Sequence, residues 1–436
     1  MIRSLLNTAN VGWFIIASFI FGTIFPTLRA VLIGSEGSTS VIDYAISAIP
    51  DVITLFIFCI SLLIHKEKTG NYFFSLNKRD YILIFILAYS LIVGGLISGD
   101  IKLIVYSVRM TYLPMLFYFT ARLLGSFWEE EFVFKLIKTF MYWLGITAII
   151  GLLLYFVFDN LEEQLKDIVH ANKGEYYIER LNSIYHAPTL NGSYMAMAAL
   201  FFLMLWHFSI NIPQIVFLFA ISASLLLSVS RGGIIGFIVS ASAGIVWIRR
   251  WKSTVFVGFL VLASVWVTSL AVGLSFNNLG WIFKSTASTV KMEEGVTRVG
   301  LWESAYTNIK DKPFGYGLGK SGWIAYRFLK DSDESSSYTS TDGWYLKQAN
   351  ETGIIGVLSY LVFFAFYIVH VFPAVKRNSF DLLMFILLLL FQVLLVCLVS
   401  NVLDYFTFNA VFWFLLALGE NMASKRLAEK KPSLNR

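Results

Sequence analysis

Arg231 occupies a position at which an arginine could do chemistry. The sequence SVSRGGIIGF at 228–237 places it between two apolar runs, each of which could span a bilayer. An arginine there costs free energy unless it faces water, a partner or a ligand. Guanidinium groups match phosphate oxygens in bidentate geometry, so an anion such as a lipid-linked pyrophosphate is a suitable ligand. Gly232 and Gly233 leave room for a ligand, or serve helix packing.

The elements that position this arginine are membrane helices. Of 436 residues, 57% are hydrophobic and 14% are charged, whereas soluble domains carry about 25% charged residues. Apolar runs of bilayer-spanning length recur, and lipid-embedded backbone satisfies its hydrogen bonds as helices. The short alternating strands of a membrane barrel are missing from the pattern. The sequence therefore predicts an all-α polytopic membrane protein, and its first apolar segment is interpreted as a retained span.

About 12 transmembrane helices are predicted in a single multi-span domain, 1–436. The predicted spans are 11–33, 43–64, 80–98, 103–123, 134–158, 190–208, 212–229, 232–249, 253–274, 344–371, 380–400 and 402–420. They leave an outer loop at 159–189, a long outer loop at 275–343 between spans 9 and 10, and a basic tail at 421–436.

Lysine and arginine concentrate in alternate short loops, of which RRWK at 249–252 is an example, and in the tail. By the positive-inside rule, both termini are cytoplasmic and the two long loops face the outside. The net charge of +6 therefore comes from basic residues in the loops that set membrane orientation, and no nucleic-acid partner is predicted. Cys59 and Cys397 lie within apolar runs, without the spacing of a metal site or a disulfide framework.

Ionisable residues within or beside the spans gather at the predicted outer ends. They are Arg29, Asp51, Arg109, Arg231, Glu351 and Asp404. A coupled carrier needs polar groups near the midplane, so this asymmetry predicts a basin open to the outside only. Its positive charge suits an anion. Arginines at span ends also snorkel to the interface, which is the alternative interpretation for each of them.

The outer loops contain further candidates. Val299, Trp302, Tyr306 and Ile309 recur at helical spacing and predict a short amphipathic helix at about 297–310. GYGLG at 315–319 follows no strand, so a sharp turn is favoured over a nucleotide site. Asp342 could cap the next helix or accept a proton from a sugar hydroxyl. His186, with Arg180 before span 6, is an acid/base candidate or a structural residue.

Four motifs in order carry a family resemblance. They are RLNSIYHAPTLNGSYMA, SRGGIIGF, TRVGLWESAYTNIKDKPFGYGLG and TDGWYLKQANETGIIGVLSYL, within residues 170–365. With this order and sidedness, the chain resembles the bacterial O-antigen polymerase and O-antigen ligase superfamily, of Wzy and WaaL type. The resemblance implies a GT-C-like glycosyltransferase at the outer face of the bacterial cytoplasmic (inner) membrane, which uses undecaprenyl-pyrophosphate-linked glycan without metal or other cofactor.

The resemblance also implies roles for residues. Arg231 and Arg298 would bind the pyrophosphate, with Arg109 and Arg180 as further candidates. An acceptor-activating residue is expected near the end of the long loop, where ligases typically have a histidine and this chain has Asp342. Asp342 or His186 would therefore orient or deprotonate the acceptor hydroxyl. The TDGWYL sequence around Asp342 looks more like polysaccharide polymerases.

The function expected from these features is an inverting, metal-independent polymerase of a surface polysaccharide. Three alternatives stay open. The first is an O-antigen ligase that transfers glycan to lipid A core or another acceptor, the second is a flippase or exporter without chemistry, and the third is an inactive assembly scaffold. Expected partners are the lipid-linked oligosaccharide and the bilayer, with a chain-length regulator and a flippase of the same pathway as candidates.

Overall fold

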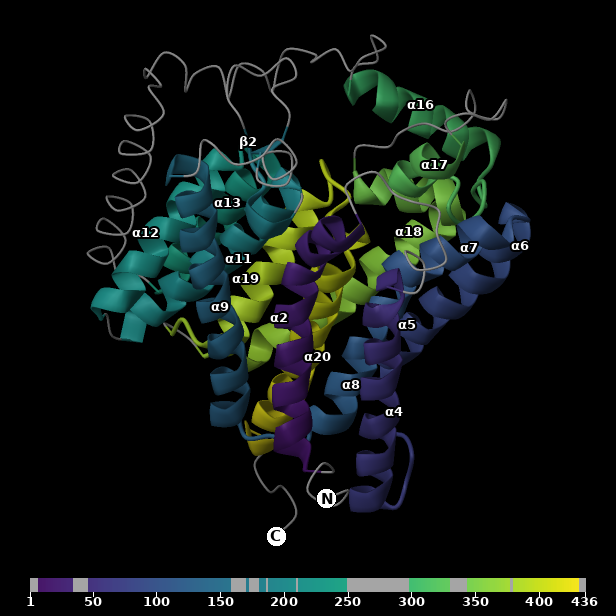
Figure 1. Ribbon diagram of the computed structural model, residues 1–436. Coiled ribbons are helices and arrows are strands. Elements are labelled where there is room, and N and C mark those ends of the chain that lie inside the picture. The colour runs from purple at the N-terminus through teal and green to yellow at the C-terminus, as the bar shows by residue number, and fades with distance from the viewer. Residues whose placement is uncertain are drawn as a thin grey trace.

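The computed structural model describes residues 7–33, 46–157, 170–171, 180–185, 187–208, 211–248, 298–329, 343–376 and 379–430. Within these ranges the chain is almost entirely helical (Figure 1). One two-residue ladder pairs β1 (His170–Ala171) with β2 (Arg180–Leu181) in antiparallel register. The all-α class predicted from the sequence is therefore confirmed for the described residues.

The α-helices of the described ranges are, in chain order, α2 (Thr8–Ile33), α4 (Ile49–Thr69), α5 (Lys78–Tyr89), α6 (Gly95–Ser98), α7 (Ile101–Ser107), α8 (Leu116–Gly125), α9 (Glu130–Val157), α11 (Pro188–Phe208), α12 (Ile212–Leu227), α13 (Arg231–Ile248), α16 (Arg298–Asp311), α17 (Gly322–Leu329), α18 (Trp344–Val371), α19 (Leu382–Val396) and α20 (Phe406–Lys430). Short π turns are η1 (Ser90–Gly94) and η2 (Val108–Tyr112), and short 3₁₀ turns are η3 (Leu113–Met115), η4 (Ser183–Tyr185), η6 (Phe372–Ala374) and η7 (Val402–Asp404).

Seven of the described helical segments are long and apolar enough to cross a membrane. They are Thr8–Arg29, Ile49–Thr69, Lys78–Ser98, Glu130–Phe156, Pro188–Leu205, Trp344–Ala374 and Phe406–Lys430, and α12, α13 and α19 are shorter apolar helices. These segments agree with a multi-pass membrane protein. The predicted span at 253–274 lies outside the described residues.

Two predicted segments differ in detail from the structure. The span predicted at 103–123 is divided into α7, η2, η3 and α8, because Pro114 supplies no backbone N–H to a continuous helix. The last span continues as α20 to Lys430, so the tail predicted at 421–436 begins as helix.

Polar residues next to the apolar runs begin several helices. The Asn77 side chain accepts the N–H groups of Arg79 and Asp80, and Asp80 completes a capping box. The side chains of Asp100 and Asp381 likewise accept backbone N–H groups at the starts of α7 and α19, without a capping box.

Among the long apolar helices of the described ranges, α11 and α20 are the most buried. In the apolar stretches of α11 and α20, 89% of the residues are buried, against 28% in α4. In Figure 1, α2 passes in front of α20, with α9 on one side of it and α4 on the other. The described core is continuous from α2 to α20 and includes rings such as Trp413 and Phe363.

Helix α2 begins and α20 ends at one end of the molecule, and α16 and α17 lie at the other (Figure 1). Following the predicted orientation, we call the end with α16 and α17 the outer end and the opposite end the inner end. At the inner end, the fully buried carboxylates of Glu420 and Asp80 pair with Arg79 at 2.5 Å and Arg122 at 3.3 Å. These ion pairs join the ends of α5, α8 and α20.

Candidate functional site

Arg231 is the first residue of α13 and follows a tight turn from α12. Val229 in this turn has φ of 50°, a left-handed conformation that is strained for a β-branched residue. The Ser228 hydroxyl donates to Leu225 O at 2.6 Å and accepts the N–H of Ser230 at 3.2 Å. The turn before Arg231 is therefore held by short local hydrogen bonds.

Glycines bring α11 and α13 into backbone contact beside this turn. A Cβ on Gly233 would lie 2.9 Å from Gly192 O, and a Cβ on Gly192 would lie 2.2 Å from the Cβ of Ser230. Small residues allow such close helix packing in membranes. The packing role that the sequence allowed for Gly233 is thus present, and it fixes the backbone that carries Arg231.

The segment 397–404, between α19 and α20, connects Arg231 to a second polar group. We call it the outer turn. On one side, a Cβ on Gly232 would lie 3.1 Å from Cγ2 of Val399. On the other side, the Trp344 N–H donates to Cys397 O at 2.9 Å and to Ser400 O at 3.2 Å. The first turns of α13 and α18 therefore pack against the same segment.

Lys347 is the centre of this second group. Its ammonium lies 2.6 Å from Oδ1 of Asp404 and 3.8 Å from Oε2 of Glu351. It also donates to Thr111 at 3.3 Å. The side chains of Lys347 and Glu351 are 0% exposed and that of Asp404 is 14% exposed. A buried charge requires such pairing, because desolvation otherwise destabilises it strongly.

Asp404 is held by one of its two carboxylate oxygens. Within the described ranges, its side-chain hydrogen bonds from Lys347 and Thr111 both end on Oδ1. Its partial exposure leaves Oδ2 in a position to accept a further hydrogen bond from a hydroxyl or from water.

Sequence reasoning missed Lys347, although a signal was present. Lys347 and Glu351 are four residues apart at the start of a predicted span, and residues at this spacing face each other on a helix. The sequence did not indicate that Asp404, 57 residues further along, would share the same ammonium.

Arg109 lies in the π turn η2 and pairs with Asp51 of α4. The distance from Nε to Oδ2 is 2.7 Å, and each side chain is 18% exposed. The ion pair offsets much of the positive charge that the sequence analysis placed in this part of the basin. A role for Arg109 in pyrophosphate binding stays a prediction.

Helix α16 covers most of the stretch for which a helix was predicted and packs against α18. The predicted apolar face is not its buried face, since Trp302 is 44% and Tyr306 71% exposed, whereas Ala305 is fully buried. GYGLG forms turns as expected, with positive φ at Gly315, Gly317 and Gly319.

The remaining predicted site residues are placed only in part. The backbone of Arg298 begins α16, and the backbone of Arg180 begins β2. Asp342 and His186 lie outside the described residues. The structure therefore places the first turn of α13, which begins at Arg231, and the first turn of α18, which carries Lys347, against the outer turn, which contains Asp404. Arg109 lies beside Asp51.

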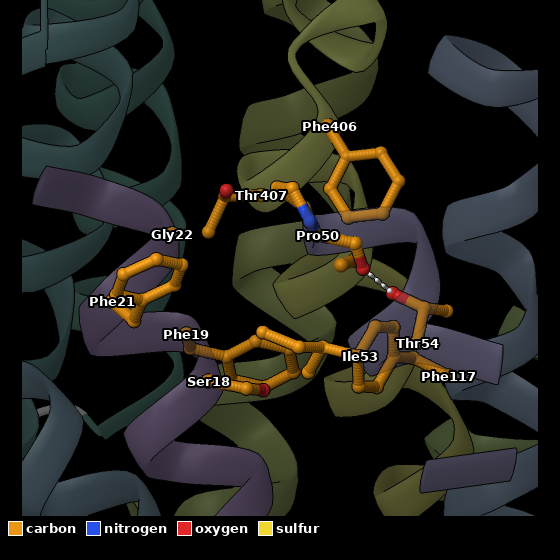
Figure 2. Close-up of a pocket in the computed structure, with 11 residues that line it drawn as sticks. Ser18, Phe19, Phe21, Gly22, Pro50, Ile53, Thr54, Phe117, Phe406 and Thr407 are labelled. Carbon is orange, nitrogen blue, oxygen red and sulfur yellow. Dashed lines mark hydrogen bonds between the residues drawn. The ribbon is translucent and has the colours of Figure 1, made fainter. Parts of the chain in front are cut away.

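An apolar pocket lies between α2, α4, α8 and α20. Figure 2 shows the rings of Phe19, Phe21, Phe117 and Phe406 around it, with the Thr54 hydroxyl bonded to Pro50 O at 2.8 Å. Its cavity volume is about 20 Å³, which holds about one water molecule. The pocket is too small for an isoprenoid chain.

The fold and the polar cluster define a multi-pass helical membrane protein with a candidate site at one end. Residues 215–361, about a third of the chain, match the family model described as O-Antigen ligase. This match supports the resemblance to the O-antigen ligase and polymerase superfamily that the motifs indicate. It supports a membrane glycosyltransferase-like enzyme of ligase or polymerase type that acts on lipid-linked polysaccharide. No curated protein matches the chain.

Proposed function

We propose that the protein polymerises a surface polysaccharide at the outer face of the bacterial cytoplasmic membrane. It would transfer an undecaprenyl-pyrophosphate-linked glycan onto a second lipid-linked repeat unit, without a metal ion and with inversion. A chain-length regulator and a flippase are the partners proposed for it in the pathway.

The position of Arg231 is the observation that carries this proposal. Arg231 begins α13, next to the outer turn that also holds Asp404. It lies within the family-matched region, which also includes the whole of α16. A half-buried arginine at the end of an apolar helix is suited to an anionic headgroup beside the lipid.

The proposed chemistry is a single displacement. The acceptor hydroxyl oxygen attacks the anomeric carbon, and the bond from that carbon to the pyrophosphate oxygen breaks. Undecaprenyl pyrophosphate leaves with the bonding electrons, and Asp342 or His186 takes the hydroxyl proton. Arg231 and Arg298 would stabilise the charge that develops on the leaving group, with Arg109 or Arg180 in support.

An O-antigen ligase is the second candidate, because the matched family model is described by that activity. The donor chemistry would be the same, and only the acceptor would differ. Asp342, where ligases of the resembling superfamily typically have histidine, is the feature that favours a polymerase.

The test uses purified protein in detergent with synthetic undecaprenyl-pyrophosphate repeat units, and product ladders are separated on a gel. We expect wild-type protein to give a ladder and Arg231→Ala to give none. Arg231→Lys keeps the charge but loses the planar fork, so reduced polymer is expected. Lys310→Ala, which removes an exposed cation from the last turn of α16, is the matched control and should keep the ladder.

The results separate the candidates. Glycan transfer to lipid A core without a ladder would establish the ligase instead. Transport of lipid-linked glycan with neither product would assign the protein to the flippase class. Normal chain length in Arg231→Ala would exclude Arg231 from pyrophosphate binding.

Asp342→Asn tests the proposed base. Asparagine can still cap the following helix, but it cannot accept the hydroxyl proton. General-base catalysis contributes about 10²–10⁴-fold to rates, so polymer should fall by about that factor while the amount of protein in the membrane is unchanged. Normal polymerisation by this variant would assign the base elsewhere, with His186→Ala as the next variant.

A further inference from the structure

Helix α18 is interrupted one third of the way along its length. Gly353 has φ of 70° and ψ of −172°, which is not a helical conformation. Such a break leaves backbone carbonyl groups without their helical partners, and within a membrane protein these groups must be paired by other parts of the chain. The carbonyls of Asn350, Glu351 and Thr352 precede the break.

The segment 313–319, which follows α16, supplies most of these partners. We call it the glycine loop. The N–H of Tyr316 donates to Asn350 O at 2.7 Å, and the N–H of Gly317 donates to Glu351 O at 3.1 Å. In return, Pro313 O accepts the N–H of Ile354 at 3.0 Å. The loop thus pairs with the interrupted helix on both sides of Gly353.

The glycines of the loop permit this approach. A Cβ on Gly315 would lie 2.7 Å from Glu351 O, and a Cβ on Gly317 would lie 2.3 Å from the backbone N of Ser98. A Cβ on Gly319, whose φ is 76°, would lie 2.7 Å from Leu103 O. Side chains at these positions would push the loop away from α18, α6 and α7.

The Glu351 side chain adds a further connection to the loop. Its Oε1 accepts the N–H of Gly319 at 3.1 Å, and its Oε2 accepts the Ser107 hydroxyl at 3.4 Å. Lys347, also in α18, balances its charge and is shared with Asp404. One buried carboxylate therefore joins the glycine loop, α7 and the cluster at the outer turn.

We propose that Glu351 is a positioning residue, which holds the glycine loop, and through it α16, against the outer end of α18. Because α16 begins at Arg298 and ends two residues before Pro313, its placement depends on how this loop is docked. The expected change in KM rests on the proposed function. The docking of the glycine loop against α18 can be measured without catalysis.

The test combines two variants that break the same contact from opposite sides. Glu351→Ala removes the acceptor and leaves Lys347 paired with Asp404. Gly319→Ala removes no charge but places a methyl group against Leu103. Gly70→Ala at the inner end is the matched control, because Gly70 has a similar φ of 79° and nothing within 4 Å of the added Cβ. Glu351→Gln retains an oxygen that can accept the Gly319 N–H.

Two measurements are made on purified full-length protein: hydrogen–deuterium exchange of peptides covering 298–319, and KM and kcat for the lipid-linked donor. We expect faster exchange in Glu351→Ala and Gly319→Ala, and KM raised about tenfold, the size of one hydrogen bond to a charged group. The double variant should be no worse than either single variant, because both changes remove one shared contact. Gly70→Ala should match wild type, and Glu351→Gln should lie close to it.

Wild-type exchange and wild-type KM in Glu351→Ala would overturn the inference, as would fully additive effects of the two variants. If Glu351→Ala yields too little folded protein, Gly319→Ala breaks the contact and Glu351→Gln keeps it, so wild-type exchange and KM in Gly319→Ala would then overturn the inference. If wild-type protein transfers no glycan at all, the proposed function fails, and the exchange data alone decide whether Glu351 holds the loop.

Discussion

At the scale of single residues, the pairing of Arg109 with Asp51 changes what Arg109 can do. A free guanidinium would attract an anion, but this one already lies 2.7 Å from a carboxylate in a mostly buried position. A substrate pyrophosphate would have to compete with Asp51 or share the guanidinium with it. The first contribution of Arg109 is therefore to the attachment of α4 to η2.

The pairing predicts how variants of the two residues behave. Arg109→Met should lower the free energy of unfolding by about 1–3 kcal/mol, because it leaves the partly buried Asp51 carboxylate unpaired. Asp51→Leu should also lower the free energy of unfolding, because it leaves the Arg109 guanidinium unpaired. The double variant should recover part of the lost free energy of unfolding. Thermal unfolding in detergent measures all three, with the exposed Lys310→Met as control. Unchanged stability together with loss of product would instead place Arg109 on the substrate.

At the scale of elements, the contact between α11 and α13 determines where Arg231 points. Gly192→Ala would force its methyl group into Ser230, the residue before Arg231. Overpacking of this kind costs about 1–3 kcal/mol, and it should reduce glycan transfer by displacing Arg231. Gly95→Ala is the matched control, because nothing lies within 4 Å of its added Cβ. Equal transfer by the two variants would show that this contact does not position Arg231.

The sequence predicts elements well where the signal is local. Apolar runs locate the helices, polar residues such as Asn77 and Asp381 mark their starts, and GYGLG indicates turns. The break at Gly353 was not predicted, because residues 344–371 form one continuous predicted span. It depends on the glycine loop, whose backbone replaces the lost hydrogen bonds.

The candidate site shows the same division between local and distant signals. The positions of Arg231 and Asp404 at the outer end follow from the order and polarity of the spans. The sharing of Lys347 by Glu351 and Asp404 does not, because it joins α18 to a turn far along the chain. The exposed face of α16 was also not predicted, since helical spacing alone does not say which face is buried.

At the scale of the whole molecule, the two ends have different polar chemistry. At the inner end, Glu420 accepts from Arg79 and Asn77, and Asp80 accepts from Tyr118 and Arg122, all in contacts between helices. At the outer end, Asp404 and Arg231 are partly exposed beside a turn. This asymmetry suits a reaction carried out from one side of the membrane better than a carrier whose site must open to both sides.

The asymmetry predicts a labelling pattern that defines the orientation of the chain. In a background with Cys59→Ala and Cys397→Ala, a single cysteine is introduced by Lys310→Cys at the end of α16 or by Lys68→Cys at the end of α4, both at exposed positions. A membrane-impermeant maleimide is added to spheroplasts before and after permeabilisation. Because α16 and the end of α4 lie at opposite ends of the molecule (Figure 1) and basic short loops stay inside, Lys310→Cys should react at once. Lys68→Cys should react only after permeabilisation. The reverse pattern would place Arg231 and Asp404 on the cytoplasmic side, where the proposed polymerase could not meet its exported substrate.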